Sequence, residues 1–201
     1  MRENRICFQK ILCTATLKTL TLNISSIPIR NYLRRSDVSA ALPAKGAFMK
    51  DVKICLACSA GGHLTEMLHL KPCYSKHPHF FLTFKRQDTS ELAKAERTHF
   101  VADPGRSPVA LLRCVAQSLS VLLKERPDVV ISTGAGVAIP ACYIAKFLLG
   151  AKVVFVESFC RIEEPSFSGR IVYPIANLFL VQWPEMLRRY GENAVYRGAI
   201  V

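Results

Sequence analysis

Short apolar runs alternate with helical periodicities from Met49 to the end of the chain, and this alternation constrains the fold more than any other feature. Each run has the length of a buried strand. Strands are expected near 52–58, 79–84, 98–101, 128–132, 152–157, 177–182 and 194–197. Helices are expected near 63–71, 88–96, 107–125, 137–149, 168–175 and 184–190. Such alternation predicts an α/β fold with a doubly wound, Rossmann-like parallel sheet.

Two of the predicted strand-to-helix junctions carry glycine loops, at 59–63 and at 132–136. Glycine lets backbone amides approach a ligand closely, and the start of a helix favours negative charge. We therefore expect a nucleotide or diphosphate crevice at these loops, although plain tight turns would give the same pattern. The residues expected to bind substrate or phosphate there are Ser59, Gly61, Gly62, Thr133, Gly134 and Gly136.

Two further strand patterns end in polar residues, at Glu157–Ser158 and at Gln182. In an open parallel sheet, residues just past the carboxyl ends of strands line the binding crevice. Ser158 and Gln182 are therefore also expected to bind substrate. Arg161 follows in the same segment, where it could neutralise a diphosphate or pair with Glu163 or Glu164.

An ordered set of motifs over residues 52–201 resembles a known family. The motifs are Ser59-Ala-Gly-Gly-His63 with Glu66, Ser132-Thr-Gly-Ala-Gly136 with Pro140, Phe155-Val-Glu-Ser158 with Arg161, and Val181-Gln-Trp-Pro184. The family is the membrane-recruiting subunit of the two-chain N-acetylglucosaminyltransferase of dolichol-linked oligosaccharide synthesis, with related capsular and exopolysaccharide glycosyltransferase subunits. A more distant similarity is to the amino-terminal half of the bacterial transferase that adds N-acetylglucosamine to lipid-linked muropeptide.

The resemblance implies the amino-terminal half of a GT-B glycosyltransferase, with the donor-binding half on a separate polypeptide. The heterodimer would transfer a sugar, N-acetylglucosamine from UDP-GlcNAc, to a lipid-linked diphosphate-sugar acceptor. This subunit would recruit its partner to the cytoplasmic face of a membrane, the endoplasmic reticulum in a eukaryote or the plasma membrane in a prokaryote, and would be inactive alone. The alternatives are a non-catalytic membrane recruitment subunit and a stand-alone nucleotide-binding module.

His63 and Glu157 are the candidate catalytic residues. Sugar transfer requires the acceptor hydroxyl to lose a proton. A helix start disfavours protonated imidazole, so a neutral His63 could accept that proton, while a cap or a phosphate contact is the alternative. Glu157 could instead be the base or orient the acceptor sugar, because a carboxylate at a strand end is costly to bury.

Residues 1–48 differ from the rest of the chain. They hold eight Lys or Arg residues and two acids, and so carry +6 of the net charge of +12. No stable periodicity or clean targeting pattern is present. We expect either a disordered basic extension or a true start at Met49, with residues 49–201 forming the Rossmann-like acceptor-side and membrane-side domain.

Several other classes of site find no support in the sequence. No aromatic-interleaved basic patch or zinc-finger spacing indicates nucleic acid. The first glycine loop lacks the GxGxxG fingerprint of nicotinamide enzymes, and no cofactor is expected. Cys55-Leu-Ala-Cys58 has the spacing of a metal or redox motif, but it lies inside an apolar run without a second ligand pair. Buried thiols are therefore expected instead of a metal site.

Two apolar segments have two interpretations each. The predicted helix at 107–125 has a broad apolar stripe, which could pack in the core or meet a lipid surface. The tail at 196–201 is unusually apolar for a terminus. We expect it to contribute to the docking surface for the partner, and the alternative is that it belongs to the core.

Overall fold

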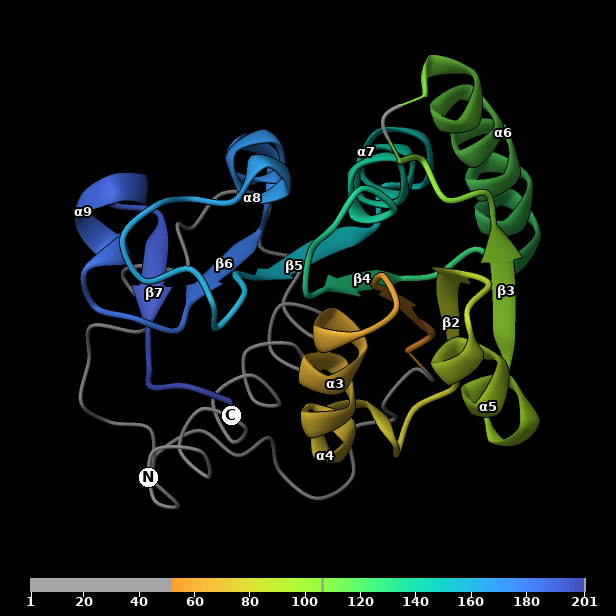
Figure 1. Cartoon of the computed structure of the whole chain (residues 1–201), viewed down its shortest axis with the longest axis horizontal. Coiled ribbons are helices and arrows are strands. Elements are labelled where there is room, and N and C mark those ends of the chain that lie inside the picture. Colours follow the sequence, from red (N-terminus) through yellow and green to blue (C-terminus); the bar gives the residue numbers. More distant parts are fainter. Residues whose placement is uncertain (1–51, 106, 201) are drawn as a thin grey trace.

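Seven strands form a single parallel sheet in the computed structural model, which describes residues 52–105 and 107–200 (Figure 1). The strands are β1 (Ile54–Ala57), β2 (His79–Phe84), β3 (Thr98–Val101), β4 (Val129–Ser132), β5 (Lys152–Val156), β6 (Leu178–Val181) and β7 (Ala194–Tyr196). Their spatial order is β3-β2-β1-β4-β5-β6-β7, and every neighbouring pair is parallel. The predicted doubly wound α/β fold is confirmed. The extension expected at residues 1–48 lies outside the described residues.

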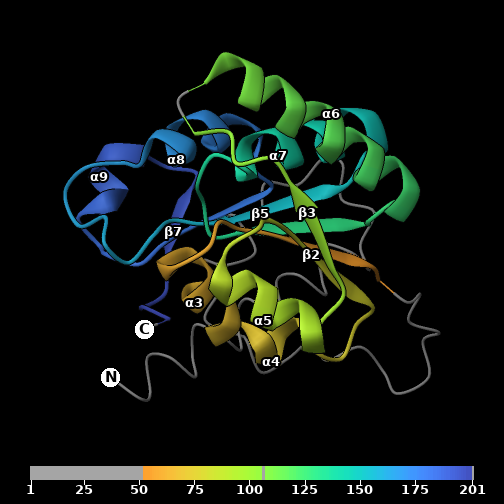
Figure 2. The ribbon, with the colours of Figure 1, turned by 45° about the vertical axis from the view of Figure 1, so that its right-hand side comes forward.

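Helices cover both faces of the sheet (Figure 2). The α3, α4 and α5 helices lie on one face, and α6, α7 and α8 lie on the other. Their bounds are α3 (Gly62–His69), α4 (Lys71–Tyr74), α5 (Gln87–Ala95), α6 (Pro108–Glu125), α7 (Ala138–Leu149), α8 (Phe167–Val172), the 3-10 helix η1 (Tyr173–Ile175) and α9 (Met186–Tyr190). Within the described residues, no helix combines the length and the apolar character that a membrane span requires.

Proline explains two differences from the predicted helices. The helix expected near 63–71 ends at His69, and α4 begins two residues later with Pro72 in its first turn. The helix expected near 168–175 changes to a 3-10 turn that contains Pro174. Proline has no N–H to donate to the preceding turn, so the α-helical hydrogen bonding stops there.

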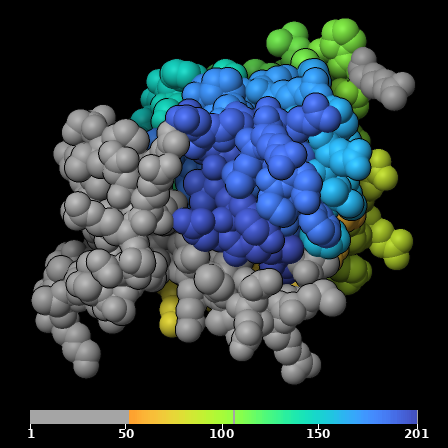
Figure 3. All heavy atoms as spheres, turned by 90° about the vertical axis from the view of Figure 1, so that its left-hand side faces the viewer, coloured from red at the N-terminus to blue at the C-terminus, as the bar shows by residue number. Residues whose placement is uncertain are grey.

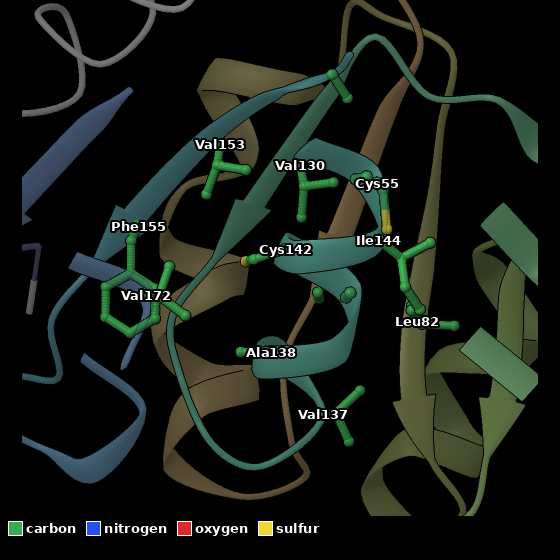
Figure 4. Packing of buried hydrophobic residues seen from close by; sticks show 14 of the residues in the cluster. Cys55, Leu82, Val130, Val137, Ala138, Cys142, Ile144, Val153, Phe155 and Val172 are labelled. Carbon is green, nitrogen blue, oxygen red and sulfur yellow. The ribbon is translucent and has the colours of Figure 1, made fainter. Parts of the chain in front are cut away.

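The sheet has an apolar layer on each face. Small residues on α7 let that helix approach the strands closely, and Figure 4 shows Ala138 and Cys142 packed over Val130 and Val153. Cys55 belongs to this layer and Cys58 to the layer on the opposite face, because successive strand side chains alternate. The two thiols therefore cannot bind the same metal ion. Burial raises the pKa of Cys58 to about 12, as expected for a buried apolar thiol.

Ile200, in the carboxyl-terminal tail, belongs to the core. Ile200 is fully buried in the layer under α3, and the chain enters this layer after β7. Figure 3 shows that carboxyl-terminal residues form much of this end of the molecule. The tail was expected to contribute to a docking surface; for Ile200 that expectation is wrong, because the side chain completes the packing of β5 and β6.

A buried carboxylate joins elements at the amino-terminal edge of the sheet. Glu125, at the end of α6, accepts hydrogen bonds from Lys53 Nζ at 2.6 Å, Arg97 Nη2 at 2.6 Å and His99 Nε2 at 2.8 Å. This cluster lies at the edge opposite to the carboxyl ends of the strands.

Candidate functional site

The two glycine loops meet where the strand order reverses. The chain begins in the middle of the sheet at β1, builds β2 and β3 on one side, and then crosses to β4 on the other side. A reversal of this kind opens a crevice at the carboxyl ends of the two central strands. The loop after β1 leads directly into His63 in the first turn of α3, and the loop after β4 carries Thr133, so the predicted crevice has both glycine loops at its base.

His63 and Thr133 hold the two loops together by reciprocal hydrogen bonds. Thr133 Oγ1 donates to the carbonyl of His63 at 2.8 Å, and His63 Nδ1 lies 2.8 Å from the carbonyl of Thr133. A carbonyl can only accept, so Nδ1 carries a proton and the neutral ring has its lone pair on Nε2. The structure therefore gives His63 the tautomer that a proton acceptor at Nε2 requires.

The pKa of His63 is lowered. Partial burial is the main cause, and the positive charge of Arg161 acts in the same direction, while the Thr133 hydrogen bond and the Glu157 charge oppose them. A lowered pKa keeps the imidazole neutral near pH 7.

The first glycine loop is open to a ligand. Apart from the adjoining residues and the backbone of α3 itself, no atom of the described residues lies within 4 Å of a Cβ built on Gly61 or on Gly62. Among residues 52–105 and 107–200, no side chain makes a capping hydrogen bond to the amino terminus of α3, and its first turn holds no acid. Asp88, on α5, accepts a hydrogen bond from Gly61 N at 2.6 Å and supports the positive φ of that glycine. This support was missed from the sequence, because Asp88 is far from the loop along the chain.

The second glycine loop, residues 132–136, is a packed wall, by which we mean that neighbouring side chains fill the space around it. Its amides at Gly134 and Ala135 donate to Ser132 Oγ at 3.1 Å and Ser168 Oγ at 3.2 Å. A Cβ on Gly136 would lie 2.6 Å from the Pro104 ring, and one on Gly134 would lie 3.2 Å from the His63 ring. Gly134 also has a φ of +113°, which L side chains rarely adopt. The geometry thus favours contact of a phosphate with the first loop over the second.

Glu157 lies in the interior and not on the crevice wall. Its side chain accepts hydrogen bonds from Ser158 N at 2.9 Å, from Ser166 N at 3.2 Å and Oγ at 3.0 Å, and from the Tyr190 hydroxyl. The residue is only 1% exposed. From the sequence, burial was expected to be costly for this carboxylate. The expectation that Glu157 would therefore stay accessible is wrong, because four hydrogen-bond donors offset the loss of hydration.

Gly169 allows this cluster to close. A Cβ at Gly169 would lie 2.1 Å from the Tyr190 hydroxyl oxygen and 2.3 Å from Glu157 Oε2. The arrangement gives Glu157 a role in shaping the segment after β5. It leaves the carboxylate no open side toward a substrate.

Ser158 and Gln182 are brought together by Glu66, which the sequence analysis quoted in a motif but did not name as a site residue. Glu66, on α3, accepts hydrogen bonds from Ser158 Oγ at 2.9 Å, Phe159 N at 3.1 Å and Gln182 Nε2 at 3.3 Å. Glu66 is three residues after His63, so the two side chains share one face of the helix. That spacing is the signal from which Glu66 could have been identified.

The two remaining predicted residues differ in exposure. Ser59 is buried, and its hydroxyl donates to the carbonyl of Ala60 at 3.1 Å. Arg161 is exposed beside a shallow hollow of about 250 Å³. Glu164, a suggested partner of Arg161, pairs instead with Arg170 at 3.1 Å and Arg189 at 3.5 Å.

Residues 84–200 match the family model described as "Oligosaccharide biosynthesis protein Alg14 like". Among curated proteins, the chain is 30% identical over 186 residues to "UDP-N-acetylglucosamine transferase subunit ALG14" of Mus musculus, which covers 76% of this chain and 84% of the mouse protein. The Homo sapiens protein of the same name is 29% identical over 183 residues and gives the same coverage.

Solved structures with the same fold are more distant in sequence. MurG of Acinetobacter baumannii superposes with a TM-score of 0.61 at 15% identity, over 74% of this chain and 45% of that chain. UDP-N-acetylglucosamine 2-epimerase of Rickettsia bellii gives 0.60 at 16% identity, over 75% and 46%. The matched region is thus less than half of each of these longer proteins.

Proposed function

The chain belongs to the Alg14 family of oligosaccharide biosynthesis proteins, and on that premise we propose that it is the acceptor-side subunit of a two-chain UDP-N-acetylglucosamine transferase. One observation carries the proposal. A histidine with a fixed tautomer lies beside an open, uncapped helix start, at the point where the strand order reverses. Ligands of open α/β sheets bind at such a point.

The donor-binding half belongs to a separate polypeptide in this proposal. The matched part of this chain covers 84% of each of the curated mouse and human proteins. The curated relatives carry the word "subunit" in their names, which supports a partner. The partner would hold the sugar nucleotide, and the cleft between the two chains would exclude water from the transfer.

His63 is the proposed general base. Its Nε2 accepts the proton as the acceptor hydroxyl oxygen attacks the anomeric carbon of the donor sugar, and the bond from that carbon to the diphosphate breaks. The leaving nucleotide diphosphate keeps the electron pair. Arg161 and the amino terminus of α3 stabilise the diphosphate of the lipid-linked acceptor next to the attacking sugar.

The membrane surface meets α6 in the same proposal. The buried side of α6 holds Cys114 and Leu122. A second apolar stripe, formed by Val109, Leu112 and Leu123, points outward, and Val109 and Leu112 are 61% and 69% exposed. Exposed Arg113 and Lys124 flank it, and basic side chains beside an apolar stripe suit a surface of anionic lipids. A lipid-linked acceptor would reach the crevice from that surface.

Reconstitution tests the proposal. The chain and a donor-binding second subunit, together in proteoliposomes, should transfer radiolabelled N-acetylglucosamine from UDP-GlcNAc to a lipid-linked diphosphate-sugar, and each chain alone should not. His63→Ala should lower turnover by roughly 10²-fold to 10⁴-fold without loss of assembly. Normal turnover of assembled His63→Ala would indicate the recruitment-only alternative, and micromolar binding of UDP-GlcNAc by the isolated chain would indicate a stand-alone nucleotide-binding module.

A further inference from the structure

Glu66 is a buried carboxylate on the helix that carries His63. The residue is 5% exposed, and burial raises its pKa. A carboxylate in that position costs free energy unless donors replace its lost hydration. The hydrogen-bond donors to the Glu66 carboxylate therefore show which segments this side chain holds in place.

Three donors from two other segments converge on Glu66. Oε1 accepts from the Ser158 hydroxyl at 2.9 Å and from the Phe159 amide at 3.1 Å. Oε2 accepts from Gln182 Nε2 at 3.3 Å. Phe159 follows β5 and Gln182 follows β6, so one carboxylate joins α3 to the ends of two strands.

The segment from Ser158 to Ser166 is fastened at both ends by buried carboxylates. Glu66 holds its start, and Glu157 holds its end through the amide and hydroxyl of Ser166. Trp183 adds a hydrogen bond from Nε1 to the carbonyl of Phe159 at 2.6 Å. Arg161 lies between the two fastened ends, so the direction in which the segment leaves Glu66 decides where the guanidinium stands relative to His63.

We propose that Glu66 is a positioning residue of the transfer site, which holds the segment carrying Arg161 in register with the helix carrying His63. The proposal rests on the proposed function, in which Arg161 stabilises the diphosphate of the acceptor. Glu66 does not itself touch the substrate, because protein donors face both of its oxygens. It acts through Ser158 and Phe159.

A carboxylate is required here and an amide would not serve. Gln182 Nε2 donates both to Glu66 and to the carbonyl of Glu157 at 3.0 Å, while Gln182 Oε1 accepts from Ile200 N at 2.9 Å. These partners fix the orientation of the Gln182 amide. In Glu66→Gln, the new NH₂ group would face either the NH₂ of Gln182 or the donors of Ser158 and Phe159. At least one hydrogen bond is lost in either case, while the volume of the side chain is kept.

Hydrogen exchange tests the physical link without any assay of activity. In the full chain, Glu66→Gln should accelerate amide exchange in the peptide containing residues 159–166 by at least about tenfold, the lower end of the range for one hydrogen bond to a charged group. Exchange in β1 and β4 should be unchanged. Glu91→Gln is the matched control, because Glu91 is exposed and bonds to Lys94. Unchanged exchange at 159–166 in Glu66→Gln overturns the proposal.

Kinetics of the reconstituted complex test the link to Arg161. Glu66→Gln should raise the KM for the lipid-linked acceptor by at least about tenfold and leave the KM for the sugar nucleotide unchanged, since this factor is the lower end of the range for a hydrogen bond to a charged group. Its effect should be less than multiplicative with that of Arg161→Ala, because residues that act through one another do not contribute independently. A fully multiplicative double variant, or a loss of kcat at constant acceptor KM, contradicts the proposal.

A second variant and the activity of the wild-type complex distinguish failure of this proposal from misfolding and from failure of the proposed function. If Glu66→Gln does not fold, Ser158→Ala removes one donor and keeps the carboxylate, and it should shift exchange and acceptor KM in the same direction by a smaller factor. A wild-type complex that transfers no sugar contradicts the proposed function alone, since the exchange result at residues 159–166 does not depend on transfer.

Discussion

His63 and Thr133 exchange two hydrogen bonds across 70 residues of sequence, each 2.8 Å long. The pair joins the first turn of α3 to the loop after β4 and fixes a proton on Nδ1 of the histidine. Because the bond to Nδ1 is made to a backbone carbonyl, no side-chain substitution at position 133 removes that acceptor. The tautomer of His63 is therefore determined by the course of the main chain.

The first prediction concerns pH. The imidazole must be neutral to accept a proton, so turnover should rise as pH increases through the pKa of His63 and then level off. Burial lowers this pKa from its ordinary value of 6.5, so the rise should be centred below pH 6.5. Turnover of the reconstituted complex, measured from pH 4.5 to pH 8, locates the midpoint of this rise. His63→Gln should remove this limb, and a limb that persists in that variant would assign the base elsewhere.

The second prediction separates the two glycine loops. Gly62→Val should keep the melting temperature and abolish most transfer, because the space above this glycine is open and a branched side chain would fill it. Gly134→Val should instead destabilise the fold, because φ is +113° and the His63 ring lies 3.2 Å from the new Cβ. Thermal unfolding of both variants, with turnover of Gly62→Val, decides the matter. A stable Gly134→Val chain would contradict the assignment of this loop as a packed wall.

The third prediction concerns stability in acid. Burial alone would raise the pKa of Glu125, but hydrogen bonds from Lys53 and His99 and the charge of Arg97 outweigh it and hold the pKa at about 2. A lowered pKa in the folded state contributes stability that is present above the unfolded pKa of about 4.5 and is lost as pH falls toward 2. The contribution is at most about 3 kcal/mol, since the partners are partly exposed.

Urea unfolding between pH 6 and pH 2.5 measures this contribution. Glu125→Gln should be less stable than the wild type at pH 6, and the difference should shrink toward pH 2.5. The exposed Glu91→Gln variant should show little change at either pH. A constant difference between Glu125→Gln and the wild type would mean that the Glu125 charge is not responsible.

The fourth prediction tests the outward stripe of α6. Leu112→Glu should reduce flotation of the chain with vesicles that contain anionic lipid, because it places a negative charge on the exposed apolar stripe. Leu68→Glu is the matched control, since Leu68 is 41% exposed on α3, on the opposite face of the sheet. Equal flotation of the two variants would show that the outward stripe of α6 does not contact the membrane.

The fifth prediction concerns the tail. Ile200→Ala should cost about 2 to 4 kcal/mol of folding free energy, the usual range for truncating a fully buried isoleucine. Chemical unfolding of the isolated chain measures the loss. A cost below about 0.5 kcal/mol, the level of a surface substitution, would contradict the burial of Ile200 and would support a docking role for the tail.

Local patterns predicted the elements of this fold well. The strands at 79–84 and 98–101 have the bounds that the sequence indicated, and α6 differs by one residue. Apolar periodicity is a property of neighbouring residues, so it can be read without knowing what packs against them. The same reasoning placed the glycine loops and polar strand ends at one edge of the sheet, because parallel strands have their carboxyl ends together.

Only the tertiary structure decided which polar groups face the crevice. A strand-end carboxylate can point to solvent or into the protein, and for Glu157 the outcome depended on Ser166 and Tyr190, which follow 9 and 33 residues later. The place of Glu66 depended on strand order, because its donors follow 92 to 116 residues later and meet only where β5 and β6 lie beside each other. The sequence determined which segments become strands and helices, since that choice is local. The tertiary structure determined which carboxylates are buried, since hydrogen-bond donors from distant segments must gather before burial is affordable.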